Sequence, residues 1–295
     1  MTEAIDFIGI GAARCGTSWI ANILRSHPKI CVSEPKEIRY FNRYVLPVSK
    51  AKGKVNSNCD RDLAWYLDRF RHAREGQLRG EYSPIYLYDE AAASAIKSCF
   101  PDVKLIACLR NPADRAYSHY WLHRGSSVLG NIAFERALQQ EEAYVGMGLY
   151  AKQLKRYLAR FDRDQLLVLI FEELIRNPAI EMRRLFEFLG VTLELELDFS
   201  RYGINQRAKV RSRALKRAAF SVSWLLVNAR LSMVVDWFRK MGVHTLLTSI
   251  NSAPLRYPPM AEATRLRLME IFNEDIAELE NLLERDLSQW RVLGA

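Results

Sequence analysis

The stretch that decides the fold is Ile5-Asp6-Phe7-Ile8-Gly9-Ile10-Gly11-Ala12-Ala13-Arg14-Cys15-Gly16-Thr17-Ser18, followed by Trp19-Ile20-Ala21-Asn22-Ile23-Leu24. Its order predicts an apolar strand, a turn of small residues and an amphipathic helix. A strand that leads into a helix in this way directs backbone N–H groups at an anion. The stretch therefore indicates an anion-binding loop, with an ordinary strand-to-helix turn as the alternative.

The loop nearly fits the pattern that binds nucleoside triphosphates. Gly11, four further residues and Gly16 have the right spacing, but Thr17 stands where the pattern has lysine. A kinase or ATPase loop uses that lysine on the terminal phosphates and a hydroxyl on magnesium. Here the only cation within the loop is Arg14. We therefore expect a phosphate site that works without a metal ion.

The size and cysteine content fit a soluble globular protein of enzyme size in the reducing cytoplasm. At 295 residues the chain is long enough for one large α/β domain with a substantial core. The cysteines are odd in number, lack C-x-x-C spacing and give no disulfide framework: Cys15, Cys31, Cys59, Cys99 and Cys108. Because apolar residues 5–10 lead straight into the loop, we expect no secretion leader or membrane anchor at the N-terminus.

Positive charge is concentrated in one part of the chain. The formal net charge is +9, and residues 201–250 hold ten lysines and arginines against the single acid Asp236. Such a segment suits a polyanionic ligand, nucleic acid or a membrane surface better than it suits general solubility. Residues 215–241 are both apolar and basic, too interrupted to span a bilayer, and predict two amphipathic helices. These helices would cap the site, contact a membrane peripherally or pack against a second subunit of a homo-oligomer, with a solvated basic face as the alternative.

Apolar runs alternate with helical segments along the rest of the chain. We predict strands at residues 5–10, 29–33, 103–109 and 166–171. This alternation favours a three-layer α/β fold, a parallel sheet flanked by helices, in a single domain over residues 1–295 with a basic helical insertion at about 205–250. Near the end, a stripe at helical spacing predicts a core-facing helix: Leu266, Met269, Phe272, Ile276, Leu279 and Leu283.

A second strand end carries a second candidate anion site. The strand that ends at Leu109 delivers Arg110, Pro112 is expected to start a helix, and Ser118 follows about two turns later. Ligands of open α/β sheets bind at such strand ends. Arg110 by charge and Ser118 by hydrogen bond are therefore candidates to hold a second phosphate. For a lone arginine, a salt bridge is the alternative.

A third candidate is Glu37, which follows the second predicted strand. In this topology its carboxylate lies close to the first loop, where it suits general-base chemistry. Lys36 and Arg39 flank it, so a surface ion pair is the alternative. Two further segments have no meaning by themselves: Gly80-Glu81-Tyr82-Ser83-Pro84 and Leu255-Arg256-Tyr257-Pro258-Pro259-Met260.

Taken in order, these five segments resemble the sulfotransferase family that uses 3′-phosphoadenosine 5′-phosphosulfate (PAPS), a family related to P-loop nucleotide enzymes. The resemblance covers nearly the whole chain and is strongest to the heparan-sulfate N- and O-sulfotransferases and their bacterial relatives. Residues 13–18 resemble the family's Lys-x-Gly-Thr-Thr loop for the 5′-phosphosulfate. Residues 109–118 resemble its 3′-phosphate segment, and Glu37 before Ile38-Arg39-Tyr40-Phe41 resembles its catalytic glutamate. Further landmarks are Gly148-Leu149-Tyr150, Asp275-Ile276, Leu279-Glu280 and Asp286-Leu287-Ser288-Gln289-Trp290.

The resemblance implies a role for each candidate. Glu37 takes the proton of an acceptor hydroxyl or amine, Arg14 stabilises the leaving phosphate, and the bisphosphate nucleotide PAP is the product. The donor-binding residues are then Arg14, Cys15, Gly16, Thr17, Ser18, Arg110 and Ser118, with Arg256, Tyr257, Arg211 and Arg213 as further candidates. No metal ion is implied, because no second-strand aspartate or ligand cluster accompanies the loop.

The sequence also departs from the family pattern. Arg14 replaces the usual lysine, and a guanidinium is a rigid fork where an ammonium is a compact donor. Tyr82 stands where the heparan-modifying enzymes carry a second active-site lysine. Residues 253–258 replace a glycine- and lysine-rich donor loop, and the basic insertion has no counterpart in the heparan enzymes. The adenine contacts and the acceptor therefore stay open.

Two other functions remain as alternatives. A kinase on the same fold is disfavoured by Thr17, and a non-enzymatic binder of polyanions or nucleic acid would use the basic insertion and show steep salt dependence. We expect a nucleotide donor, no nucleic-acid partner and a small-molecule, glycan or lipid acceptor. The basic segment suits an anionic acceptor, whereas Trp224 and Trp237 within it suit a lipophilic one.

Overall fold

The structure is a computed structural model that describes residues 4–44, 57–125, 130–192, 208–210, 252–254 and 257–292. The chain divides into two compact units, one formed by residues 1–204 with 260–295 and the other by residues 205–259. The described elements of the first unit are β1 (Phe7–Gly11), α1 (Thr17–Ser26), β2 (Ile30–Val32), α3 (Leu63–Leu67), η1 (Asp68–Phe70), β3 (Leu78–Tyr82), α4 (Ala92–Cys99), β4 (Lys104–Leu109), α5 (Pro112–Gly125), α6 (Phe134–Gln140), α7 (Ala143–Gly146), α8 (Tyr150–Leu158), η2 (Arg163–Gln165), β5 (Leu166–Ile170), α9 (Phe171–Arg176), α10 (Pro178–Leu189), α14 (Glu262–Leu283) and η4 (Ser288–Arg291).

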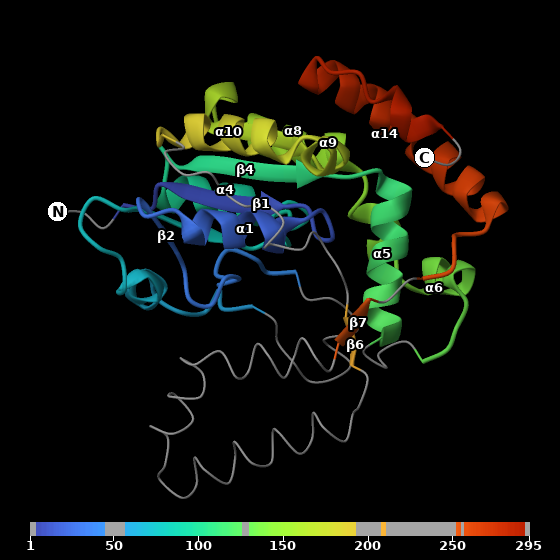
Figure 1. The fold of residues 1–295 in the computed structure, drawn as a ribbon, viewed down its shortest axis with the longest axis horizontal. Coiled ribbons are helices and arrows are strands. Elements are labelled where there is room, and N and C mark those ends of the chain that lie inside the picture. Colours follow the sequence, from blue (N-terminus) through green and yellow to red (C-terminus); the bar gives the residue numbers. More distant parts are fainter. Residues whose placement is uncertain are drawn as a thin grey trace, which may run out of the picture. The chain divides into compact units, whose positions relative to one another are not determined.

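A parallel five-stranded sheet with the order β2-β3-β1-β4-β5 forms the middle layer of the first unit (Figure 1). The central strand β1 pairs with β3 on one side and β4 on the other. The carboxyl ends of β1, β2 and β4 therefore meet at one edge, where the loop after Gly11, the segment after Val32 and Arg110 all begin. This arrangement confirms the predicted α/β fold and the four predicted strands.

Helices cover the sheet on both faces. On one face α1 packs with α10, where the His27 and Phe186 rings lie 4.9 Å apart. On the other face α4 lies beside the end of α8, because the Lys97 ammonium lies 4.8 Å from the centre of the Phe161 ring. Right-handed crossovers explain this division, since β1 connects to β2 in one direction along the sheet and β3 to β4 in the other.

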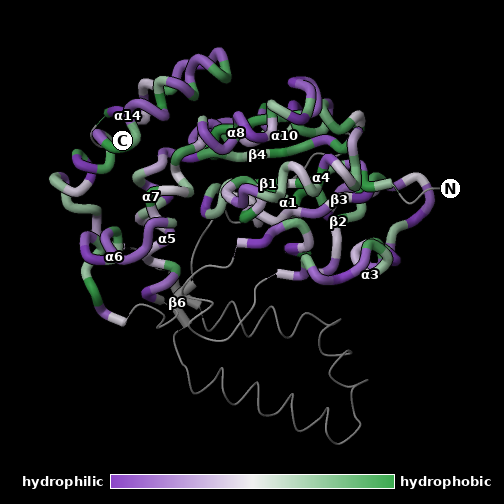
Figure 2. The backbone as a smooth tube through the Cα atoms, turned by 180° about the vertical axis from the view of Figure 1, so that it is seen from behind, coloured by the Kyte–Doolittle hydropathy of each residue, from purple (hydrophilic) through white to green (hydrophobic). Residues whose placement is uncertain are grey.

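The core is formed by apolar strands and by the inward faces of the helices. Figure 2 shows β4 as hydrophobic along its length, and its residues 105–109 are fully buried. The sequence analysis missed β3, which has the sequence Leu-Arg-Gly-Glu-Tyr. Gly80 lies in its middle because a Cβ atom there would lie 2.4 Å from the Phe7 ring. Because β3 has a glycine and a buried glutamate at positions where a buried strand usually has apolar residues, it lacks the apolar pattern that predicts a strand.

The predicted stripe of α14 is wrong in part. Phe272, Ile276 and Leu279 are buried as predicted, but Leu266 is 44% exposed. Leu268 is buried in its place, so the buried face at the start of α14 is rotated from the predicted one. Figure 2 shows polar and apolar residues alternating along this helix.

The second unit contains a two-stranded antiparallel sheet of β6 (Ala208–Val210) and β7 (Ser252–Pro254) among its described residues. The two amphipathic helices predicted for residues 215–241 lie outside the described residues, as does most of the predicted insertion at 205–250. Their structure and the single-domain assignment stay predictions. Among the described helices, none combines the length and the apolar composition that crossing a bilayer requires.

Candidate active site

The loop between β1 and α1 forms the first part of the site. Gly16 precedes the helix with a φ of 78°, in the left-handed region, and no side chain caps the first turn. A Cβ atom on Gly16 would lie 3.0 Å from the Phe171 ring, so both the backbone and the available space favour glycine. The first N–H groups of a helix have no intrahelical acceptor and carry partial positive charge. This helix start is therefore suited to bind a phosphate group.

Arg14 and Ser118 meet across the edge of the sheet. Arg14, which has a φ of 75°, donates a hydrogen bond from Nε to Ser118 Oγ over 3.2 Å. Pro112 starts α5, as predicted, and places Ser118 on the side of that helix facing the loop. From the sequence, the two residues were expected at opposite ends of a nucleotide. Their contact indicates one continuous anion-binding surface.

Cys15 contributes only its backbone to this surface. Its side chain is fully buried, with Sγ 3.8 Å from the Tyr150 hydroxyl. That hydroxyl donates to the Arg110 carbonyl over 3.0 Å, and the thiol itself donates to the Ala13 carbonyl over 3.7 Å. Burial raises the pKa of Cys15 to about 11, against the opposing charge of Arg115, and the thiol stays neutral. Tyr150, the first residue of α8, therefore ties the loop to the end of β4.

Arg110 lies at the end of β4 over an aromatic ring. Its guanidinium carbon is 4.9 Å from the centre of the Phe171 ring. Among the described residues no carboxylate lies within ion-pair distance of it. The next residue is fixed from two sides, because the Asn111 amide N–H donates to Glu172 Oε1 over 2.9 Å and its side chain donates to the Trp290 carbonyl over 2.9 Å. Arg110 is thus a cation on a rigid support.

Glu37 lies in the segment that follows β2 and is held between two cations. Its carboxylate is 3.3 Å from Lys36 Nζ and 2.5 Å from Arg39 Nη2, and its side chain is 31% exposed. Burial raises the pKa of Glu37, but the charges of Lys36 and Arg39 outweigh burial and hold it below its usual value. The ion pair expected as the alternative is therefore present, and the Glu37 side chain is still reachable from solvent, while its role as general base stays a prediction.

Lys36 connects the loop after β1 to the Glu37 segment, a role that the sequence did not predict. Its ammonium donates to Ser18 Oγ over 3.2 Å, contacts Glu37 and lies 5.8 Å from the centre of the Tyr82 ring. Burial lowers the pKa of Lys36, although Glu37 acts in the opposite direction. The only signal for Lys36 in the sequence was its position next to Glu37. An ordinary surface ion pair gives the same signal.

The remaining donor-binding candidates are placed less completely. Thr17 is buried at the start of α1 and Ser18 is exposed beside it. Tyr257 is half-buried and belongs to the second unit. Arg211, Arg213 and Arg256 lie outside the described residues.

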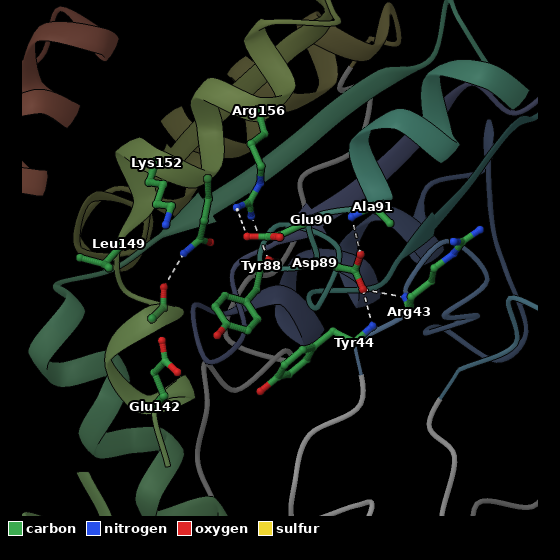
Figure 3. A pocket seen from close by; sticks show the side chains of 12 residues that line it. Arg43, Tyr44, Tyr88, Asp89, Glu90, Ala91, Glu142, Leu149, Lys152 and Arg156 are labelled. Atoms are coloured by element: carbon green, nitrogen blue, oxygen red, sulfur yellow. Dashed lines mark hydrogen bonds and ion pairs between the residues drawn. The ribbon is translucent and has the colours of Figure 1, made fainter. Parts of the chain in front are cut away.

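A cavity of about 490 Å³ lies where the segment after Glu37 meets α8 (Figure 3). Asp89 fixes that segment, because its Oδ2 accepts the Arg43 amide over 2.6 Å and the Tyr44 amide over 2.5 Å. Figure 3 shows Lys152 and Glu142 on the side of the cavity opposite Asp89. The lining carries both charges and two tyrosines: Arg43, Tyr44, Tyr88, Asp89, Glu90, Ala91, Glu142, Gly146, Leu149, Lys152, Gln153 and Arg156.

The fold and the site together define a P-loop-like α/β protein in which two strand ends suited to anions lie beside a carboxylate. A family model, the sulfotransferase domain, matches residues 4–209. The chain belongs to this family of sulfotransferases.

Known relatives agree with this assignment. Mouse heparan sulfate glucosamine 3-O-sulfotransferase 3A1 is 31% identical over 192 residues, which cover 62% of this chain and 44% of that protein. Human bifunctional heparan sulfate N-deacetylase/N-sulfotransferase 2 is 29% identical over 206 residues, covering 63% and 22% of the two chains. The chain thus matches about half or less of the length of these curated relatives. The crystal structure of a sulfotransferase from Alicyclobacillus acidocaldarius superimposes with a TM-score of 0.72 at 28% identity, covering 98% of this chain and 99% of that one.

Proposed function

We propose that the protein transfers the sulfuryl group of PAPS to a hydroxyl or amine of a small-molecule, glycan or lipid acceptor, with Glu37 as general base. The observation that carries the proposal is the 3.2 Å contact between Arg14 and Ser118. It joins the loop after β1 to the helix after β4, so one surface offers cations and hydroxyls to a nucleotide with phosphates at both ends. Membership of the sulfotransferase family supports this choice of donor.

The residues present fit such a nucleotide. The start of α1 and Arg14 suit the 5′-phosphosulfate, because backbone amides and a guanidinium both bind phosphate oxygens. Arg110 and Ser118 suit the 3′-phosphate. Arg110 stacks on Phe171 and has no carboxylate partner among the described residues. Its charge is therefore available to an anion.

In the proposed reaction the acceptor oxygen or nitrogen attacks the sulfur atom. The bond from sulfur to the 5′-phosphate oxygen breaks, PAP leaves with the electron pair and Glu37 takes the acceptor proton. Lys36 lies between Ser18 and Glu37, so it is suited to stabilise the leaving phosphate. Glu37 becomes a stronger base when Lys36 exchanges its carboxylate contact for that phosphate, because the charge that lowers its pKa moves away.

The acceptor is the least defined part of the proposal. The relatives named for heparan sulfate support a glycan, and the family model spans Glu37 and both strand ends. The cavity beyond Tyr44 begins on the same segment as Glu37, and we propose that it binds a part of the acceptor away from the reacting group. Its tyrosines and its side chains of both charges suit a polar, hydrogen-bonding ligand.

A transfer assay tests the function directly. The purified chain is incubated with radiolabelled PAPS and heparan-type oligosaccharides, lipid extracts or small-molecule extracts, and labelled products are identified by mass. We expect a labelled product, and we expect its formation to survive chelation of divalent metals. Transfer of phosphate from ATP in the presence of magnesium would support the kinase alternative. Tight, salt-sensitive binding of polynucleotides without any transfer would support the polyanion binder.

The location and the assembly of the protein are further proposals. We propose a cytoplasmic location in a bacterial cell. Peripheral membrane contact or homo-oligomer formation through residues 215–241 depends on a segment outside the described residues. Fractionation with and without vesicles and light scattering would test these proposals.

A further inference from the structure

A fully buried polar cluster lies beneath the turn that carries Glu37, and the proposed reaction does not use it. The cluster consists of Glu81 at the end of β3, together with Ser83 and Tyr86 in the loop that follows. The side chains of all three have no exposed surface. A buried carboxyl group is costly unless its hydrogen bonds are satisfied, so its presence here needs a reason.

Every hydrogen bond found at the Glu81 carboxyl group is donated to it. Ser83 Oγ donates to Oε2 over 2.6 Å and the Tyr86 hydroxyl donates to Oε1 over 2.9 Å. The backbone N–H of Ile38 donates to Oε2 over 3.3 Å. A carboxylate can only accept, so its ionised form matches this arrangement.

The two hydroxyls extend this network to the Glu37 turn. The Arg39 N–H donates to Ser83 Oγ over 3.0 Å. The N–H groups of Tyr40 and Phe41 donate to the Tyr86 hydroxyl over 2.8 Å and 3.3 Å. Each hydroxyl has a single proton, which goes to Glu81, and its lone pairs then accept the amides. Four consecutive N–H groups, 38 to 41, therefore end on Glu81 directly or through one hydroxyl.

The turn held in this way is strained. Arg39 has a φ of 56°, which is in the left-handed region that a non-glycine residue rarely adopts. Such a conformation persists only when the surroundings impose it. Here the Arg39 amide is fixed by Ser83, and its guanidinium returns to Glu37. The geometry of the Glu37 ion pair thus depends on this backbone conformation.

We infer that Glu81 is a positioning residue for Glu37, which it holds in place by orienting Ser83 and Tyr86 toward the amides of residues 38 to 41. Its role in catalysis rests on the proposed function, whereas its role in holding the turn does not. When Glu81 is protonated, its own hydroxyl must donate, so Ser83 or Tyr86 has to turn its proton away, and the hydrogen bonds from the amides behind that residue must rearrange.

The surroundings of Glu81 make this change accessible near neutral pH. The groups that face it are Ser83, Tyr86, the Ile38 amide and the Tyr66 hydroxyl of α3, and none is a cation. Burial raises the pKa of Glu81 to about 7, against the lowering effect of these donors. We therefore expect kcat to rise with pH through about 7 as the carboxylate forms. In the ligand-free protein Glu37 has a lowered pKa, and loss of the rise in Glu81→Gln distinguishes Glu81 from Glu37 once Lys36 has moved to the phosphate.

The test combines amide exchange with kinetics in Glu81→Gln. Because the substituted side chain has an amide group in place of one acceptor oxygen, we expect hydrogen exchange at residues 38 to 41 to accelerate by about tenfold or more. We expect kcat to fall by about a hundredfold, since small misplacement of a catalytic group is costly. The rise of kcat near pH 7 should disappear. PAP affinity should stay within about twofold of the wild type, because Glu81 does not contact those of the described residues that are proposed to bind phosphate.

Glu141→Gln is the matched control, because Glu141 is also a buried glutamate whose pKa is raised by burial and it lies outside the cluster. If Glu81→Gln does not fold, Ser83→Ala and Tyr86→Phe each remove one branch and should accelerate exchange at Arg39, and at Tyr40 with Phe41, respectively. Unchanged exchange at these amides in a folded variant would overturn the inference. A pH profile that Glu81→Gln leaves unaltered would also overturn it. If the wild-type chain transfers no sulfuryl group at all, the proposed function fails, and the exchange data still decide whether Glu81 holds the turn.

Discussion

The phosphate-binding half of the site and the Glu37 half use their cations differently. In the first half Arg110 is supported by an aromatic ring, and the start of α1 offers backbone amides. In the second half Lys36 and Arg39 are already engaged by the Glu37 carboxylate. The first half thus offers groups suited to an anion, whereas in the second half the cations are already paired with Glu37. Under the proposed function, the second half exchanges ion pairs before it reacts.

This difference implies that donor binding and proton transfer can be separated by mutation. Changes in the first half should act on nucleotide affinity, and changes in the second half on turnover. Lys36 links the two halves through its hydrogen bond to Ser18. The following variants are ordered from the largest expected effect to the smallest.

Glu37→Gln should keep donor affinity and lose turnover by about a thousandfold, because glutamine cannot take the acceptor proton. Titration with PAP and steady-state kinetics measure the two quantities. Glu34→Gln is the control, since it removes a charge from the same segment at an exposed position. Wild-type turnover in Glu37→Gln would remove Glu37 from the mechanism and with it the proposed division of the site.

The pH dependence of the free energy of unfolding should reveal the protonation of Glu81, the buried carboxyl group beneath the Glu37 turn. The pKa of Glu81 in the folded chain, about 7, lies above its ordinary value of 4.5, so folding favours the protonated form. Its contribution is complete below pH 4.5 and is lost as pH rises through 7. We expect the unfolding free energy of the wild type, relative to Glu81→Gln, to fall by about 3 kcal/mol over this range. Denaturant titrations at several pH values measure it, and parallel curves for the two proteins would contradict the prediction.

Arg110→Ala should weaken PAP binding by about tenfold to a hundredfold, as expected when a charged hydrogen-bond partner is removed. The same variant should bind adenosine 5′-phosphate nearly as well as the wild type, because that nucleotide lacks the 3′-phosphate. Arg124→Ala, at the other end of α5, is the control. Equal losses for both nucleotides would show that Arg110 does not select the 3′-phosphate.

Lys152→Ala should raise the acceptor KM by about threefold and leave kcat and PAP affinity unchanged, because a partly exposed charge contributes little. Lys155→Ala is the control, since Lys155 lies on the same helix and pairs with Glu278 away from the cavity. If both substitutions change the acceptor KM equally, the cavity does not bind the acceptor.

The sequence was most informative where function depends on backbone and least informative where it depends on buried polar contacts. The loop from Gly11 to Gly16 and the strand before Arg110 were predictable, because apolar runs and glycine spacing report strands and turns directly. β3 was missed, because its central Gly80 makes room for Phe7 and its Glu81 is satisfied by hydroxyls from its own loop. Neither cause leaves a periodic signal.

The same limit applies inside the site. Arg14 and Ser118 were each predicted as phosphate ligands, but their contact depends on how β1 and β4 pair, which no local pattern records. The sequence predicted Lys36 only as the partner of an ion pair with Glu37, and the structure adds its hydrogen bond to Ser18. The exposure of Leu266 shows that the α14 stripe predicted a helix correctly but not its rotation.

The central claim is that the surface between the loop after β1 and the end of β4 binds both ends of an adenosine bisphosphate. Isothermal titration of the purified chain with PAP, without divalent metal, tests it most directly. We predict one nucleotide per chain, with affinity that falls sharply when the 3′-phosphate is absent from the ligand. The absence of any binding heat for a folded chain, or equal affinity for PAP and adenosine 5′-phosphate, would contradict the account.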